Sequence, residues 1–348
     1  MYIKQSACIS PQRTFDNAFL EGNVATYKGI RYQAIEPEYN DLIPAGLLRR
    51  MGKAIRMGVG AGLPLIRETP VDGIILGTAN GGLEDCLKFL NQIVDYNEGT
   101  LTPTNFVQST PNAVAGNLAL MSKITGYNTT HVHNGLAFEA ALLDAWMLLQ
   151  EGRAERLLVG TVEEISDYNH NIDSLGGSFK KGDFTSDELF TSNTPGSVNG
   201  EGAVMFVIEE KKSAESVARI VDVDQTSYLP ESGLHDRIQS FLAKNGLTPE
   251  DIDSLFIGIS GDSRTDYLYT SMREKLFSKS NCYSYKNFVG DYPTASAFAT
   301  WLGVQMLAGK KLPDQCKYAF SEEKEPRNIL IYNQFKGLQH GLILLGAS

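Results

Sequence analysis

The sequence predicts an α/β fold organised around a largely central β-sheet. Short apolar runs that end in or near glycine recur along the chain, at 71–82, 156–164, 202–210, 252–262, 328–335 and 342–346. Continuous apolar runs of this length are typical of strands that are buried on both faces. Segments of helical composition lie between these runs, and strands that alternate with helices indicate an α/β architecture.

A repeated pattern predicts that this fold has two related halves. Two of the strand-like runs open with an aliphatic residue and an aspartate, and a glycine follows the aspartate five residues later. The pattern runs from Asp72 to Gly77 and again from Asp253 to Gly258.

The helical segments repeat as well, because 137–152 and 297–309 are both rich in alanine and leucine and both end at glycine. We therefore expect a first half at 1–210 and a second half at 211–348. The charged stretch 209–218 reads as the connection between them.

The composition excludes several classes of partner. The 348 residues are 42% hydrophobic and 21% charged, with a formal net charge of -10 and a pI near 5.1. Surfaces for nucleic acid or anionic membranes require clustered Lys and Arg, so we expect neither partner. No segment approaches the roughly 18 apolar residues of a membrane span, and the N-terminal residues lack the apolar run of a signal peptide. We expect a cytoplasmic protein.

The four cysteines, Cys8, Cys86, Cys282 and Cys316, include no CxxC pair, so neither a zinc site nor a disulfide framework is predicted. None falls on a turn, and we interpret all four as packed thiols rather than nucleophiles. We expect no metal and no cofactor.

The segment 130–152 carries a turn of a kind that acyl-transfer enzymes use. The β-like stretch THVH leads directly into a helix, and Asn134-Gly135 forms the turn between them. Many such enzymes mount a nucleophile at this point, where it meets the unpaired N–H groups of the helix N-terminus. Here the tip is Gly135, which has no side chain.

Other polar residues offer weaker candidates. His131 and His133 would share one face of a strand, but no third ligand cluster accompanies them, so we favour imidazoles packed beside an interface. Glu163 and Glu164 would face opposite ways on a strand, which argues against an acid/base pair. Glu201 opens a strand after a glycine-rich loop, where its carboxylate would accept backbone N–H groups, with catalysis as the alternative.

The segment 173–202 is rich in Gly, Ser, Asp and Thr and has no apolar period. We expect a long loop there, and loops of that length are often binding or interface elements.

Several segments, taken in order, resemble the ketosynthase (β-ketoacyl-ACP synthase) branch of the condensing enzymes, which have the thiolase fold. The most specific matches are GTANGG, the run TPTNFVQSTPNAVAGNLALMSKITGYNTT, the turn with its helix, and VGTVEE. Later segments match by order and spacing, at 200–209, 252–262, 286–299, 309–313 and 328–346. The resemblance covers nearly the whole chain. It implies a thiolase-like fold with two pseudo-repeated βαβαβαββ halves in α/β/α/β/α layers.

In that family a cysteine on the turn takes the acyl chain, and two histidines assist malonyl decarboxylation and stabilise the thioester oxyanion. By spacing, the resemblance places the cysteine position on Gly135 and the first histidine position on Ser260. The second histidine position, after a lysine matched by Lys286, falls on Asp291. Glycine cannot carry a thioester, and serine and aspartate do not donate a proton near neutral pH as imidazole does. We therefore expect these positions to be inactive in condensation.

The resemblance also suggests residues that would bind the acyl chain. Asn134 is the neighbour of Gly135 that offers a side chain, and Phe335 begins an altered form of the family's glycine-rich loop at 335–339. Lys286 joins this set. Phe106 and Phe138 would line an acyl tunnel, with an ordinary place in the core as the alternative.

The implied function is that of a partner subunit. In aromatic polyketide, aryl polyene and flexirubin-type pathways, a ketosynthase pairs with a nucleophile-lacking paralogue, the chain-length factor. We expect a chain-length-factor-like heterodimer partner of an active ketosynthase, with acyl carrier protein and an acyl chain as further partners. The family dimer joins the strand before the turn across a two-fold axis, so 128–134 would be an edge that needs a partner strand.

Two alternatives stay open. One is a divergent condensing enzyme or acyltransferase of the 3-oxoacyl-ACP synthase type, in which Asn134, Ser260 and Asp291 perform a different step. It predicts turnover by the chain alone. The other is a homodimer without catalysis that binds acyl-CoA or acyl carrier protein as a scaffold.

Overall fold

A computed structural model describes residues 1–182, 184–320 and 325–348, and it confirms the predicted α/β class. Eleven strands form one sheet in the order β11-β10-β9-β12-β13-β8-β1-β7-β5-β3-β4. The first-half strands are β1 (Tyr2–Ile9), β3 (Gly73–Thr78), β4 (Asn128–Val132), β5 (Arg156–Glu163) and β7 (Gly202–Glu209). The later strands are β8 (Ala218–Ser227), β9 (Ser254–Ile257), β10 (Asn281–Ser284), β11 (Lys317–Ala319), β12 (Asn328–Phe335) and β13 (Gln339–Gly346). A separate pair joins β2 (Arg31–Tyr32) to β6 (Asn199–Gly200).

The two halves have the same topology. The first contains the order β4-β3-β5-β7-β1 and the second contains β10-β9-β12-β13-β8. When these five strands are counted in chain order within each half, both orders read third, second, fourth, fifth, first. The second strand is parallel to the third and fourth in each half, and the fifth is antiparallel to both of its neighbours. The pseudo-repeat inferred from the aspartate-glycine pattern is thus a property of the fold.

A narrow seam joins the halves. Strand β1 pairs with β8 only through Tyr2 with Arg219 and Ile3 with Ala218. The connection between β7 and β8 covers 210–217, so the boundary expected at 210 lies within it.

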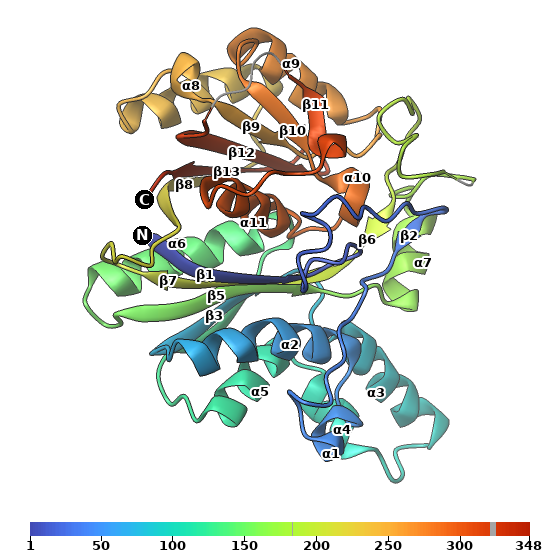
Figure 1. Cartoon of the computed structure of the whole chain (residues 1–348). Coiled ribbons are helices and arrows are strands. Elements are labelled where there is room, and N and C mark those ends of the chain that lie inside the picture. The colour runs from blue at the N-terminus through green and yellow to red at the C-terminus, as the bar shows by residue number, and fades with distance from the viewer. Residues whose placement is uncertain (183, 321–324) are drawn as a thin grey trace.

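Helices form three of the five layers (Figure 1). The central layer holds α6 (Ala137–Gln150) and α11 (Ser296–Leu307), which lie between the two halves of the sheet. Both are apolar on most faces because they pack against strands on two sides. The outer layers contain α2 (Lys53–Glu68) and α5 (Ala113–Ser122) on one side, and α8 (Leu234–Lys244) and α9 (Asp266–Leu276) on the other.

The remaining helices lie around these layers. They are α1 (Ala45–Leu48), α3 (Leu83–Asp95), α4 (Pro103–Gln108), α7 (Asp167–Leu175) and α10 (Lys286–Val289). None of the helices in the described part of the chain is long and apolar enough to cross a membrane.

Strand β4 lies at one end of the sheet, where β3 is its only partner among the described residues. Its residues are half-buried to exposed, and Val132 is 53% exposed. Large apolar side chains are also exposed on α3, α4, α5 and α7, including Val94, Phe106, Val107, Leu120, Ile172 and Leu175. Of these helices, α5 contacts β4. An unpaired strand edge and exposed apolar side chains are each typical of surfaces that meet a partner.

Candidate functional site

The turn between β4 and α6 has the predicted elbow geometry. Strand β4 ends at Val132, a 3-10 turn covers Asn134–Leu136, and α6 begins at Ala137. Asn134 has a φ of 46°, in the left-handed region that asparagine tolerates better than most residues. The chain therefore reverses sharply and places the backbone of Gly135 at the N-terminal end of α6.

Two side chains from the second half close over Gly135. Its N–H donates a hydrogen bond to the Gln339 side-chain oxygen Oε1 at 2.9 Å. A Cβ atom added at Gly135 would lie 2.2 Å from Cβ of Phe335. Because real Cβ contacts are never this short, no residue with a side chain fits here unless Phe335 moves.

Phe335 and Gln339 flank the tight hairpin between β12 and β13, where they pair with each other. The N–H of Leu338 donates to the carbonyl oxygen of Phe335 at 3.0 Å. Lys336 and Gly337 have φ values of 53° and 66°, as the two central residues of a type I′ turn require.

Ser260 follows β9, and its backbone is held by the half-buried carboxylate of Asp266. Asp266 accepts the N–H groups of Ser260 at 3.2 Å and Gly261 at 2.7 Å, and it lies 3.4 Å from the Ser260 hydroxyl. Burial raises the pKa of Asp266 to about 6, while Lys286 opposes and Asp291 reinforces the shift. Ser260 is thus paired with a carboxyl group rather than with an imidazole.

Asp291 follows α10 and pairs with Lys286. The Lys286 Nζ atom lies 2.7 Å from Asp291 Oδ1, and the Lys286 side chain is only 1% exposed. The backbone N–H of Asp291 donates to the carbonyl oxygen of Val198 at 2.7 Å. The carboxylate of Asp291 thus offsets part of the cost of burying the Lys286 ammonium. The structure therefore brings Ser260, Lys286 and Asp291 into one charged cluster around Asp266.

Two tyrosines tie the strand ends beneath this cluster together. Tyr285 donates to the Asn333 side-chain oxygen at 3.0 Å, and the Tyr269 hydroxyl accepts the Gln334 N–H at 3.0 Å. Burial raises the pKa of both tyrosines well above its usual value. Gly258 makes room for them, because a Cβ there would lie 2.6 Å from the Tyr269 hydroxyl.

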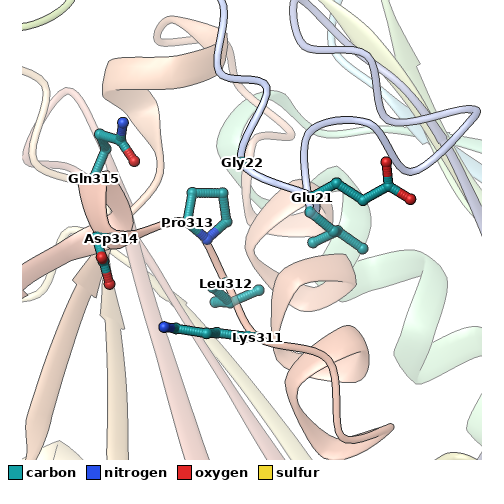
Figure 2. A pocket seen from close by; sticks show the side chains of 8 residues that line it. Glu21, Gly22, Lys311, Leu312, Pro313, Asp314 and Gln315 are labelled. Atoms are coloured by element: carbon teal, nitrogen blue, oxygen red, sulfur yellow. The ribbon is translucent and has the colours of Figure 1, made fainter.

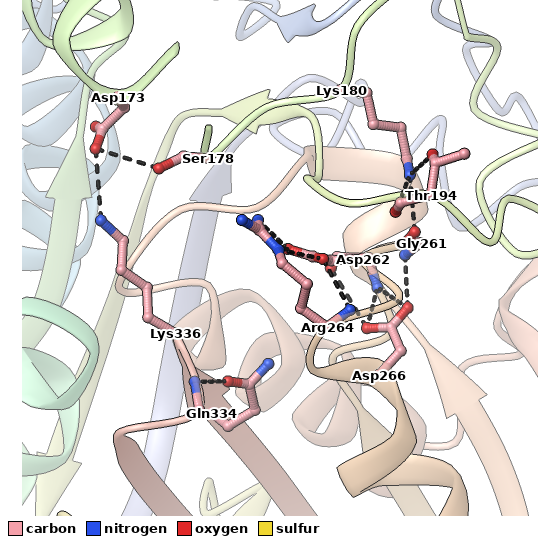
Figure 3. A network of polar contacts seen from close by, with 12 residues as sticks. Asp173, Ser178, Lys180, Thr194, Gly261, Asp262, Arg264, Asp266, Gln334 and Lys336 are labelled. Atoms are coloured by element: carbon pink, nitrogen blue, oxygen red, sulfur yellow. Dashed lines mark hydrogen bonds and ion pairs between the residues drawn. The ribbon is translucent and has the colours of Figure 1, made fainter. Parts of the chain in front are cut away.

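The loop predicted at 173–202 is shorter in the structure, because α7 extends to Leu175 and β6 covers Asn199–Gly200. The loop at 176–198 crosses from the first half onto this cluster, apart from residue 183, which lies outside the described residues. Figure 3 shows Lys180, which is 3% exposed, donating to the Gly261 carbonyl at 2.7 Å and to Thr194 Oγ1 at 3.0 Å. A bridge between Thr194 and Asp262 continues the attachment. The loop therefore covers the backbone that follows Ser260.

The two predicted tunnel residues lie in different environments. Phe138 is fully buried in the central core and stacks on Phe206, with ring centroids 5.8 Å apart. Phe106 is 59% exposed on α4, where its ring contacts Phe89. The structure does not bring Phe106 and Phe138 together, and contact of either with an acyl chain stays a prediction.

The weaker candidates have structural partners. His131 Nε2 lies 2.8 Å from Asp144 Oδ2, and the described residues include no group of three or more side chains placed to hold a metal. Glu163 accepts the Ala79 N–H at 2.5 Å, whereas Glu164 accepts the Ala54 N–H at 3.1 Å, so the two glutamates do face apart.

Glu201 is fully buried and accepts the backbone N–H groups of Ala34 at 2.6 Å and Ile165 at 2.8 Å, as the sequence predicts. It also accepts a hydrogen bond from Lys53. The cysteines are free thiols, and burial raises the pKa of Cys8 and Cys282 to about 12, so these two are packed rather than reactive.

Sequence reasoning missed Gln339 and Glu139. The resemblance assigns 335–339 to the loop at the acyl site, but it gives no sign that the Gln339 side chain bonds a turn 204 positions earlier. Glu139 is fully buried on α6 and lies against Gly341, and neither carboxylate oxygen makes a hydrogen bond of ordinary geometry within the described residues. Burial raises its pKa to about 7. A charged residue inside the apolar helix 137–152 is the signal that could have identified it.

The prominent surface groove lies elsewhere. It has a volume of about 530 Å³ and is lined by Leu20, Glu21, Gly22, Lys311, Leu312, Pro313, Asp314 and Gln315 (Figure 2). None of the predicted site residues lines it.

Comparisons with known proteins agree with this geometry. The family model described as the N-terminal domain of beta-ketoacyl synthases matches residues 26–174, which include the elbow. No curated protein matches the sequence.

Three solved structures share the fold over the whole chain. A beta-ketoacyl synthase from Burkholderia phymatum STM815 has a TM-score of 0.81 at 16% identity, covering 100% of this chain and 99% of that one. The ishigamide ketosynthase/chain length factor has a TM-score of 0.78 at 15% identity, covering 100% and 98%. AntDE:AntF, a type II PKS acyl-carrier protein in complex with its ketosynthase bound to the hexaketide, has a TM-score of 0.76 at 16% identity, covering 100% and 99%. The predicted thiolase-like ketosynthase fold is confirmed.

Proposed function

We propose that this chain, which has the ketosynthase fold and matches the N-terminal domain of beta-ketoacyl synthases, is a chain-length-factor-like subunit. It pairs with an active β-ketoacyl-ACP synthase in polyketide or fatty-acid-type chain elongation and does not itself condense. The observation that carries this proposal is the elbow, where Gly135 has no side chain and Phe335 fills the space that one would need.

The chemistry of condensation requires groups that these positions lack. An acyl chain is held on a thiolate, and glycine offers no atom for that bond. Ser260 is bonded to Asp266 and Asp291 to Lys286, so neither position offers an imidazole that exchanges protons near neutral pH. Gly135, Ser260 and Asp291 therefore serve the fold in this proposal rather than the reaction.

The exposed edge at β4 supports the proposal of a partner subunit with the same fold. Within the described residues strand β4 has one free edge, and the apolar Leu120 is exposed on α5, a helix that contacts β4. One structural neighbour is a ketosynthase/chain length factor and another contains an acyl-carrier protein with its ketosynthase. We extend these assemblies to this chain as proposals, with a ketosynthase, an acyl carrier protein and the carried acyl chain as its partners.

The test is a mild affinity purification of the tagged chain from its native host, followed by native mass measurement and identification of the co-purifying proteins. A cysteine-containing ketosynthase at a one-to-one ratio supports the proposal, and condensation is then assayed on the pair. A homodimer alone contradicts it and favours the acyl-binding scaffold.

A second candidate is a divergent condensing enzyme or acyltransferase. It is favoured by the raised pKa of Asp266, about 6, next to the Ser260 hydroxyl, because a carboxyl group that titrates near neutrality can exchange protons in a reaction. This candidate predicts turnover of acyl and malonyl carrier-protein substrates by the purified chain, and loss of that turnover in Asp291→Asn. No turnover by the wild-type chain excludes it.

A further inference from the structure

The hairpin that joins β12 to β13 contacts Gly135 of the elbow through two side chains. The Gln339 oxygen Oε1 accepts the Gly135 N–H at 2.9 Å. Phe335 covers the Gly135 Cα, since an added Cβ would lie 2.2 Å from its own Cβ. Residues 335–339, here called the plug, thus occupy both the hydrogen-bonding position and the space at the elbow.

The hydrogen bond is of a particular chemical kind. The Gly135 N–H lies at the start of α6, where unpaired N–H groups and the helix dipole favour oxygen acceptors. The carboxamide oxygen of Gln339 is a carbonyl acceptor, as is the oxygen of an acyl thioester. The same N–H therefore suits either acceptor, and in this chain the acceptor is internal.

We propose that residues 335–339 form a built-in plug, in which the Gln339 carboxamide takes the place at the Gly135 N–H that the carbonyl of an acyl thioester would take. The inference rests on the proposed function only for this class of ligand. The contacts themselves belong to the isolated chain.

Neighbouring residues hold the backbone of the plug in position. The Gly337 N–H donates to the Gln334 side-chain oxygen at 2.6 Å, and the Tyr228 N–H donates to the Leu338 carbonyl at 2.7 Å. An acceptor tethered in this way competes as if present at about millimolar concentration or more. A free thioester must therefore displace Gln339 before it can bind.

Release of the plug depends little on charge. Lys336 Nζ lies 3.5 Å from Asp173 Oδ1, as Figure 3 shows, but the two side chains are 53% and 38% exposed. Exposed ion pairs contribute little to stability. Packing of Phe335 and the Gln339 hydrogen bond therefore carry most of the closure, and the decisive variants lie at these two positions.

The test uses hydrogen exchange of peptides that cover 133–140, measured by mass spectrometry on the isolated chain. Gln339→Leu keeps the size and removes the oxygen, so exchange should rise about fivefold, the factor for one hydrogen bond of about 1 kcal/mol. Gln339→Glu keeps an oxygen and should not raise exchange. Gln305→Leu is the matched control, because Gln305 lies on α11 and its side chain bonds Ser6 of β1 instead of the elbow. Unchanged exchange in Gln339→Leu overturns the proposal.

The ligand is tested with octanoyl-N-acetylcysteamine thioester. In Gln339→Leu, and more strongly in the double variant Phe335→Gly with Gln339→Leu, the thioester should slow exchange of these peptides while the wild type shows no change. If the double variant does not fold, the single variant decides. Faster exchange that the thioester does not reverse overturns the assigned ligand. A failed co-purification with a ketosynthase contradicts the proposed function and leaves these results unaffected.

Discussion

Asp72 and Asp253 make the same contact in the two halves of the molecule. The Asp72 carboxylate accepts the N–H groups of Glu155 and Arg156 at 2.8 and 2.9 Å, at the start of β5. The Asp253 carboxylate accepts those of Arg327 and Asn328 at 3.0 Å each, at the start of β12. Each aspartate thus connects the second strand of its half to the fourth.

Removal of either carboxylate should destabilise the protein by a similar amount. We expect Asp72→Ala and Asp253→Ala each to lower the free energy of unfolding by about 1–2 kcal/mol, since each loses charge-assisted hydrogen bonds. The two effects should add in the double variant, because the sites share no partner. Urea denaturation measures all three, and a marked departure from additivity would argue against equivalent, independent contacts.

Side chains at the elbow should be tolerated only when Phe335 loses its Cβ. Gly135→Ala should cost about 1–3 kcal/mol through overpacking. Phe335→Ala keeps the Cβ that lies 2.2 Å from the added one, whereas Phe335→Gly removes it. The cost of Gly135→Ala should therefore fall in the Phe335→Gly background and persist in Phe335→Ala. Equal costs in the two backgrounds, measured by denaturation, would contradict the steric argument.

Two buried glutamates should stabilise the protein less as the pH rises through neutrality. Burial raises the pKa of Glu139 and of Glu163 from 4.5 to about 7, so the folded state binds their protons more tightly than the unfolded state does. Their contribution is fully present below pH 4.5 and is lost as the pH rises through 7. Burial lowers the pKa of the Met1 ammonium to about 6, which acts in the opposite direction, so the test is the change caused by one substitution. In Glu139→Gln, the melting temperature at pH 8 relative to that at pH 6 should be higher than in the wild type. The exposed Glu250→Gln is the control and should leave the difference unchanged.

The loop over the cluster should loosen when its buried cation is removed. Lys180→Met loses the bonds to Gly261 and Thr194, so the loop should detach more often from the second half. Limited proteolysis should then cut within 184–197 faster than in the wild type. Lys336→Asn, which removes an exposed ion pair at a left-handed position, should show a much smaller effect. Equal cleavage rates of Lys180→Met and the wild type would contradict this interpretation.

A charge at the sheet edge should block assembly without affecting the fold. Val132 is 53% exposed at the end of β4, so Val132→Lys should leave the melting temperature nearly unchanged and prevent pairing with a partner strand. Light scattering after size exclusion measures the assembled mass. Tyr228→Lys, at an exposed residue of the second half, is the control. An unchanged mass for Val132→Lys would show that this edge is not the interface.

Much of the fold could be predicted because its signals are local. The apolar runs predicted the buried strands, and the spacing from Asp72 to Gly77 and from Asp253 to Gly258 marked equivalent strands of the two halves. The elbow was also predictable, because Asn134-Gly135 stands between a strand-like and a helix-like segment.

The resemblance placed 335–339 at the acyl site, but the contacts of these residues with Gly135 could not be predicted, because they join residues that are distant in the sequence. Phe335 and Gln339 reach Gly135 only after the two halves have packed together. Phe138 was expected either in a tunnel or in the core, and only the packing of α6 between two layers of strands places it against Phe206. Residue type alone did not distinguish these environments.

The pairing of β1 with β7 delays the completion of the first half of the sheet during synthesis. Tyr2 pairs with Glu209, so β1 waits for about 200 further residues before its neighbour exists. At roughly 5–20 residues per second, that delay is about 10–40 s. The first half can then close as a unit while the outer side of β1 stays open until β8 emerges. Slow translation after residue 209 would lengthen the period in which β1 has an unpaired edge that can pair incorrectly with other strands.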